Sequence, residues 1–196
     1  MIWPVDLAAD RLADGEVSLR PYSSADAEGL FGAVRDDRVW AHLPRQIPVT
    51  AADLDAVMRA SVGDATRIVF TIRVAGVIVG TTSVYYDPAD PVGVEIGSTM
   101  LDQSTWGTGI NTQAKHLLIR ELFAAGAAWI QFRTDERNGR SAAAIRKLGA
   151  TDLGVRQDRL VRRDGTVRRS RFFRLEWPAS CDCHGHGVPH DRRRTR

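Results

Sequence analysis

A loop with two glycines, between an expected strand and an expected helix, is the part of the sequence with the clearest chemical meaning. Gly107 and Gly109 allow the backbone to approach a bound anion closely. The first amides of the following helix have no intrahelical partner, and the helix dipole favours negative charge there. These features suit a pyrophosphate, although a plain strand-to-helix turn has the same pattern. The loop lacks the Gly-Lys-Ser/Thr ending of a P-loop, and it lies later in the chain than a dinucleotide-binding loop.

The two cysteines of the chain lie near its C-terminus beside three histidines: Cys181, Cys183, His184, His186 and His190. Structural zinc sites usually draw pairs of ligands, about two to four residues apart, from two separate turns. The Cys-x-Cys-His spacing is cramped for such a site, so we predict no metal cofactor. The composition of this segment cannot build a core, and we expect residues 179–196 to be a disordered tail.

Length and composition indicate one globular domain. The chain has 196 residues, of which 43% are hydrophobic and 26% charged, values that are ordinary for a soluble protein. It has no apolar run long enough to span a membrane and no visible signal peptide, so we expect no membrane partner. Cysteines confined to the end of the chain exclude a disulfide framework. A cytoplasmic location is therefore expected.

The net charge of +3 is unevenly distributed. Residues 1–155 carry a small excess of acidic side chains, and a cluster of arginines occupies residues 156–176. This cluster suits a solvated sheet edge, an acidic acceptor, ribosomal RNA or a cofactor phosphate. Because no aromatic platform or nucleic-acid-binding module accompanies it, we expect no specific nucleic-acid partner.

Hydrophobic periodicity predicts the elements that position these groups. Four helices and about seven strands alternate along the chain in a mixed α/β order. We expect helices at 27–34, from 51, at 111–123 and at 141–148, and strands at 17–22, 67–74, 77–86, 92–101, 128–134, 152–161 and 166–177. The Asp164-Gly165 pair predicts a tight turn between the last two strands. Residues 1–14 are then an N-terminal extension, and residues 15–178 form the domain.

Four motifs in order resemble those of the GNAT superfamily of acyl-CoA N-acyltransferases, and within it the RimJ/RimL-type N-terminal acetyltransferases. They are Glu95-Ile96-Gly97, Trp106 to Thr112, Asn138 to Ser141, and Arg146 to Ala150. The resemblance covers about residues 15–177. It implies a single α/β domain with a mixed, mostly antiparallel sheet of about seven strands, splayed at its centre and flanked by about four helices.

The resemblance also implies a site for acetyl-CoA. The backbone amides expected to cradle the pyrophosphate are those of Trp106, Gly107, Thr108, Gly109, Ile110 and Asn111, with Thr112 nearby. Backbone groups of Met100 and Leu101 are expected to bind the pantetheine arm, and Asn138 to hold it from the other side. Ser104 and Gln113 depart from the residues usual in the family, but neither change touches the backbone cradle.

Direct transfer of an acyl group to an amine needs a base, a donor to the oxyanion and a proton for the departing thiolate. Glu95 is the candidate base, acting through a water, unless it only anchors the substrate ammonium. Ser141 is the candidate proton donor to sulfur, but it also suits a helix N-cap. An amide at Met100 or Leu101 is the expected oxyanion donor. Tyr85 is an alternative proton donor.

The acceptor side is expected to include Trp40, His42 and Tyr85. Trp40 and His42 lie in the segment after the first helix, where acceptor-binding loops occur in this fold, although a lone tryptophan and histidine in a loop more often have packing or surface roles. Tyr85 has Tyr86 as its neighbour, and the alternation of a strand turns one of the two toward the core.

The sequence therefore predicts an enzyme that moves an acetyl group from acetyl-CoA directly to a primary amine, either a protein N-terminus or a small molecule. The alternative is a non-catalytic acyl-CoA-binding or ribosome-associated module. The identity of the acceptor, the preferred acyl chain and the formation of a homodimer are left open by the sequence.

Overall fold

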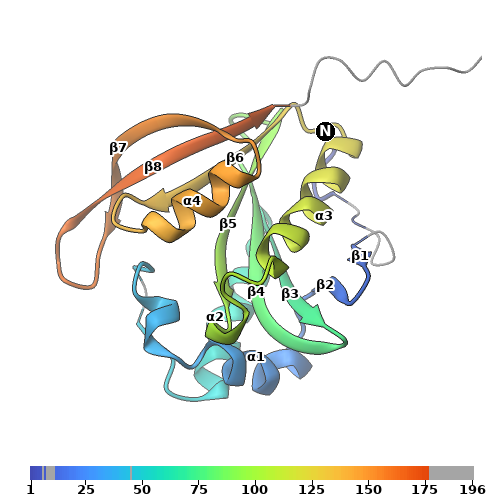
Figure 1. Ribbon diagram of the computed structural model, residues 1–196, viewed down its shortest axis with the longest axis vertical. Helices are drawn as coiled ribbons and strands as arrows, with labels where there is room; N and C mark the ends of the chain where they lie inside the picture. Colours follow the sequence, from blue (N-terminus) through green and yellow to red (C-terminus); the bar gives the residue numbers. More distant parts are fainter. Residues whose placement is uncertain (6, 8–11, 45, 177–196) are drawn as a thin grey trace, which may run out of the picture.

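An eight-stranded mixed sheet organises the computed structural model, which describes residues 1–5, 7, 12–44 and 46–176 (Figure 1). The strand order is β1-β2-β3-β4-β5-β6-β8-β7, and among the described pairs only β5 and β6 run parallel. The strands are β1 (Ala13–Asp14), β2 (Val17–Pro21), β3 (Arg67–Val74), β4 (Val77–Tyr86), β5 (Gly93–Leu101), β6 (Trp129–Asp135), β7 (Thr151–Val161) and β8 (Val167–Glu176). The expected mixed, mostly antiparallel sheet is confirmed, with the two-residue β1 as an additional strand.

Helices cover both faces of this sheet, as Figure 1 shows. The helices are α1 (Ala27–Val34), α2 (Ala51–Val62), α3 (Ile110–Ala124) and α4 (Gly139–Lys147), with short 3-10 turns η1 (Ser24–Asp26), η2 (Asp37–Trp40) and η3 (Gln103–Thr105). Helices α3 and α4 pack with one buried cluster, and α1 and α2 with another. Adjacent residues of one strand, such as Val69 and Phe70, enter different clusters because strand side chains alternate between faces.

Local sequence explains where the helices begin. Thr50 and Asp53 form a reciprocal capping box at the start of α2, with the Thr50 hydroxyl accepting from the Asp53 amide at 3.1 Å. Gly109, with φ of 92°, precedes the first turn of α3. A residue with a Cβ adopts this left-handed conformation only at a cost, so glycine suits the position where the chain turns from β5 into α3.

The centre of the sheet is opened by a β-bulge and by divergence of two strands. In β5, Ser98 and Thr99 lie opposite the single residue Thr82 of β4, and Ser98 has a positive φ of 47°. Strands β5 and β6 pair only from Gly93 to Ile96, after which they separate. The predicted splay is thus present, and it lies next to the bulge.

The N-terminal part of the chain contributes to the core. Val5 and Leu12, which the sequence places in an extension, are buried in the cluster beneath α3. The predicted Cys/His/Arg-rich tail, residues 179–196, lies outside the described residues. No helix in the described part of the chain is long and apolar enough to cross a membrane.

Candidate active site

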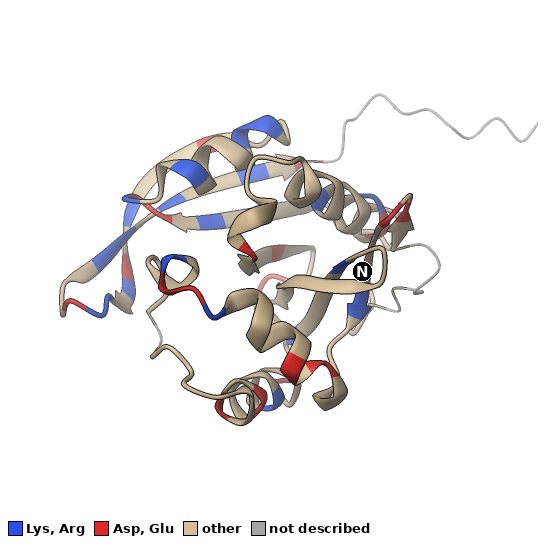
Figure 2. Ribbon diagram, turned by 60° about the horizontal axis from the view of Figure 1, so that its bottom comes forward, with Lys and Arg blue, Asp and Glu red and all other residues tan. Residues whose placement is uncertain are grey.

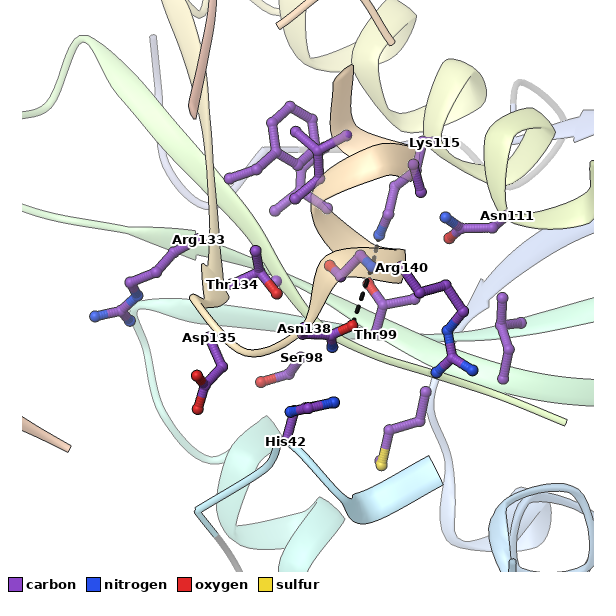
Figure 3. Close-up of a pocket in the computed structure, with 18 of the residues that line it drawn as sticks. His42, Ser98, Thr99, Asn111, Lys115, Arg133, Thr134, Asp135, Asn138 and Arg140 are labelled. Carbon is purple, nitrogen blue, oxygen red and sulfur yellow. Dashed lines mark hydrogen bonds between the residues drawn. The ribbon is translucent and has the colours of Figure 1, made fainter. Parts of the chain in front are cut away.

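A cavity of about 640 Å³ occupies the gap between the diverging ends of β5 and β6. Twelve of the predicted site residues line it: Glu95, Met100, Leu101, Trp106, Gly107, Gly109, Asn111, Thr112, Asn138, Ser141, His42 and Tyr85. Figure 3 shows His42 on one side of this cavity, with Lys115 and Asn111 on the opposite side. Residues that lie up to about a hundred positions apart in the sequence therefore meet around one space.

The start of α3 presents unused backbone amides to the cavity. The first hydrogen bond back along the helix runs from the amide of Gln113 to the carbonyl of Gly109, at 3.0 Å. The amides of Ile110, Asn111 and Thr112 precede this bond and have no intrahelical acceptor. Together with the dipole of the helix, they form a site suited to a phosphate group.

Fewer backbone amides are available to a pyrophosphate than the sequence suggested. The amide of Trp106 donates to the carbonyl of Gln103 at 3.1 Å, and the amide of Thr108 donates to the carbonyl of Thr105 at 3.4 Å. These two amides close the turn that includes η3, so they are not available to a ligand as the sequence led us to expect. The remaining amides of the loop and of the first turn of α3 are free of such backbone hydrogen bonds in the described structure.

The end of β5 turns alternate backbone groups into the cleft. The amide of Asp102 donates to Val79 of β4 at 2.8 Å, and successive strand residues point their amides to opposite edges. The amides of Thr99 and Leu101 therefore face the cleft, whereas that of Met100 faces β4. The amides open to the expected pantetheine and oxyanion contacts are thus those of Thr99 and Leu101. The expectation for Met100 is corrected, because its backbone pairs with β4.

The N-cap of α4 is Asn138, not Ser141. Asn138 is the N-cap, and its Oδ1 accepts from the Ser141 amide at 3.0 Å. The Ser141 side chain is not the cap, and it lies at the wall of the cavity. Both residues thus face the site from the side opposite β5.

Glu95 is held in place by two neighbours on β6. Its Oε2 accepts from the side-chain Nε2 of Gln131 at 3.1 Å, and its Oε1 lies 3.4 Å from Nε of Arg133. Tyr85 lies directly opposite Glu95 in the β4–β5 register and bonds to the hydroxyl of Ser98. Tyr86 instead stacks on Trp3 at the core, which confirms that only one of the two tyrosines faces the site.

His42 and Trp40 differ in their positions. His42 lines the cavity, and its pKa is lowered by burial and by the nearby Arg140, with Asp135 opposing. Its imidazole is therefore neutral at neutral pH. Trp40 is buried, and its Nε1 donates to the carbonyl of Val34 at 2.6 Å. The expectation that Trp40 contacts the acceptor is corrected, because its side chain anchors the segment that carries His42.

Several charged residues of the cavity were missed from the sequence. Arg133 and Asp135 lie at the end of β6, Arg140 stacks over the Trp106 ring at 3.2 Å, and Lys115 projects from α3 (Figure 3). The position of Arg133 and Asp135 at the carboxyl end of a parallel strand was an available signal, since ligands often bind there. No sequence pattern singled out Lys115.

Half of the eight arginines in the β7–β8 hairpin form ion pairs among the described residues. Figure 2 shows acidic and basic residues interspersed along it. The ion pairs are Arg162 with Asp135 and Glu136, Arg168 with Asp135, Arg169 with Glu136, and Arg171 with Asp152. In the same hairpin Arg163 donates to the carbonyl of Trp40 at 3.2 Å. The cluster therefore joins the hairpin to the ends of β6 and η2.

Comparison with known proteins identifies the family. Residues 16–151 match the acetyltransferase (GNAT) domain family. A protein assigned as an acetyltransferase from T. thermophilus is 29% identical, with a TM-score of 0.76, over 84% of this chain and 88% of its own. A RimL ribosomal L7/L12 alpha-N-protein acetyltransferase is 17% identical, with a TM-score of 0.72, over 84% of this chain and 92% of its own. The search of curated proteins gave no match. The chain belongs to the GNAT acetyltransferases, enzymes that use acetyl-CoA as the acyl donor.

The residues present fit acetyl-CoA. The amides at the start of α3 suit a pyrophosphate, and the backbone of Thr99 and Leu101 offers an edge to an extended arm. Oδ1 of Asn111 is buried and has no hydrogen-bond partner in the structure, so it is an acceptor available to a ligand donor. In the described part of the chain, no group of three or more His, Cys, Asp or Glu residues is arranged to hold a metal ion.

Proposed function

We propose that this acetyltransferase moves the acetyl group of acetyl-CoA directly to a primary amine while both substrates are bound. The observation that carries the proposal is the continuity of one cavity. It joins the amide-lined start of α3, where a pyrophosphate fits, to Glu95 and His42 on the opposite side. A donor and an acceptor can therefore meet within it without a covalent acyl-enzyme.

The donor is held by residues on both sides of the cleft. Amides of Gly107, Gly109, Ile110, Asn111 and Thr112 bind the pyrophosphate in this proposal. Thr99 and Leu101 bind the pantetheine arm through their backbone, and Asn138 contacts it from α4. These contacts place the thioester next to the bulge in β5.

Proton movements are assigned to two side chains. Glu95 accepts a proton from the acceptor ammonium through a water, and its contacts with Gln131 and Arg133 fix the orientation of the carboxylate. The freed amine attacks the thioester carbonyl, and the amide of Thr99 or Leu101 donates to the oxyanion. As the C–S bond breaks, the Ser141 hydroxyl gives its proton to the leaving thiolate and takes up the second proton of the attacking nitrogen, so that the products are a neutral amide and the free thiol of coenzyme A.

The acceptor enters beside His42 and Tyr85, where the segment after α1 and the β7–β8 hairpin flank the cavity. Two acceptor classes fit this proposal, a protein N-terminus and a small amine. One structural neighbour is a RimL that acts on ribosomal L7/L12, and another is a microcin C7 self-immunity acetyltransferase bound to acetyl-CoA and AMP. We expect the reaction in the cytoplasm, with no nucleic acid or membrane required. A homodimer stays a prediction, to be tested by light scattering.

A screen for thiol release tests this function. Peptides with free N-termini, polyamines and amino sugars are each incubated with the protein and acetyl-CoA or succinyl-CoA, and free coenzyme A is measured with a thiol reagent. We expect release that depends on one class of amine. Tight binding of acetyl-CoA without release by any amine would contradict the proposal and support the non-catalytic binding module.

A further inference from the structure

Lys115 lies inside the cavity at a position that the acetyl transfer described above does not use. It projects from α3 toward the sheet and is 5% exposed. Its Nζ donates to Oγ1 of Thr82 on β4 and to Oγ1 of Thr99 on β5, at 2.6 Å in each case. Figure 3 shows the contact with Thr99, at the side of the cavity that faces His42.

Among the described residues, the Lys115 ammonium has only neutral hydrogen-bond partners. Among the ion pairs of the described residues, none includes Lys115, and its hydrogen-bond partners are two neutral hydroxyls. Burying an ammonium without a carboxylate is costly, and methionine could fill the same space without that cost. A buried cation that lines a ligand cavity is therefore a candidate for work on the ligand.

The partners of Lys115 place it next to the reacting bond. Thr99 follows the bulge at Ser98, and its amide faces the cleft on the far side of β5 from β4. In the proposed reaction the thioester carbonyl lies against this backbone. An ammonium bonded to the Thr99 side chain thus brings positive charge close to the oxygen on which negative charge develops.

We propose that Lys115 is a positioning residue for acetyl transfer, whose ammonium, held on Thr82 and Thr99, stabilises the oxyanion that forms at the bulge of β5. The inference rests on the proposed function and assigns the Lys115 ammonium a part in the same acetyl-transfer site. Lys115 forms no covalent bond in this role, and its proton stays on Nζ throughout the reaction. The amine proton still leaves through Glu95.

The protonation state of Lys115 makes the role measurable. Burial lowers the pKa of its ammonium from 10.5 to about 7. Its described hydrogen-bond partners are the hydroxyls of Thr82 and Thr99, from β4 and β5, and Asn111, one turn earlier on α3, lines the same cavity. None of these titrates, and burial is the only cause of the shift. The stabilising charge is therefore largely present below about pH 6 and is lost as the pH rises through about 6 to 8, around the pKa of about 7.

Kinetics of three variants across pH test the proposal. At pH 6.5 we expect Lys115→Met to lower kcat about 10- to 100-fold, with the KM for acetyl-CoA changed less than about threefold. The ratio of wild-type to variant kcat should shrink toward pH 9, because the wild-type enzyme then loses the same charge. Lys115→Arg should restore part of the activity at high pH. Arg120→Met, at an exposed position on the same helix, should match the wild-type enzyme.

A loss of kcat that is equal at all pH values and is not restored by arginine would overturn the proposal, since a purely structural role predicts that result. Infrared spectroscopy of bound [1-¹³C]acetyl-CoA, without any amine, gives a second reading that needs no turnover. The carbonyl stretch should be lower at pH 6 than at pH 9 in the wild-type protein and independent of pH in Lys115→Met. A pH-independent wild-type stretch would reject the role of Lys115 even where the amine screen succeeds.

Discussion

At the scale of single residues, the proposal assigns binding of acetyl-CoA mainly to backbone amides and proton transfer to the side chains of Glu95 and Ser141. Glu95 is the only predicted base, and its carboxylate is bonded to Gln131 and lies near Arg133. The sequence pointed to Glu95 and Ser141 because of where they fall in family motifs. It could not show the missed Lys115, because a lysine in a helix is usually exposed and its burial depends on tertiary packing.

Replacing the proposed base tests its role. We expect Glu95→Gln to lower kcat about 10²- to 10⁴-fold, because the amide cannot accept the amine proton. Acetyl-CoA binding, measured by calorimetry, should be retained. Glu28→Gln, an exposed position on α1, serves as the matched control. Unchanged turnover of the Glu95→Gln enzyme would show that water removes the proton without this carboxylate.

At the scale of elements, the catalytic geometry depends on one loop, one bulge and one hairpin. The glycine loop and the order of strands and helices could be predicted, since turn residues and periodicity are local signals. The bulge at Ser98 was not predicted, because a non-glycine residue with positive φ leaves no sequence signature. The ion pairs of the hairpin arginines with Asp135, Glu136 and Asp152 join residues far apart in the sequence, so they could not be predicted from it either.

Two glycines that flank α3 allow the effect of backbone strain to be distinguished from an effect on ligand binding. Gly109 and Gly126 have φ of 92° and 90°, with nothing within 4 Å of an added Cβ. Alanine at either position should cost about 1 kcal/mol of unfolding free energy because of its conformation. Only Gly109 lines the cavity, so only Gly109→Ala should weaken acetyl-CoA binding, measured by calorimetry. Equal binding by both variants would remove the glycine loop from the donor site.

The β7–β8 hairpin is fixed to the site by a buried ion pair. Nε and Nη2 of Arg162 donate to Asp135 at 2.7 and 2.9 Å, and both side chains are largely buried. Arg162→Met should lower the unfolding free energy, since it leaves the Asp135 carboxylate buried with a weaker partner. Chemical denaturation measures this loss, and Arg38→Met, in an exposed pair with Asp36, should cause a clearly smaller loss because solvent screens that pair. Equal losses would mean that the buried pair does not hold the hairpin.

At the scale of the whole molecule, the buried Lys115 links stability to pH. Its pKa of about 7 in the folded protein lies below the ordinary value of 10.5. The unfolded chain therefore binds more protons between these values, and this group makes stability rise with pH from about 7 to 10.5. Lys115→Met should stabilise the protein at pH 6 by on the order of 2 kcal/mol, with a smaller effect at pH 10. Urea denaturation at both pH values measures this difference, and a variant less stable at pH 6 would contradict it.

The central claim, direct transfer of an acetyl group to an amine, is tested most directly by following a labelled acetyl group. The protein is incubated with acetyl-CoA that carries a deuterated methyl group and with the amine found in the screen, and both protein and product are weighed by mass spectrometry. We predict that the amine gains one labelled acetyl group and that the protein carries none during turnover. A labelled protein that passes its acetyl group to added amine after acetyl-CoA is removed would contradict direct transfer.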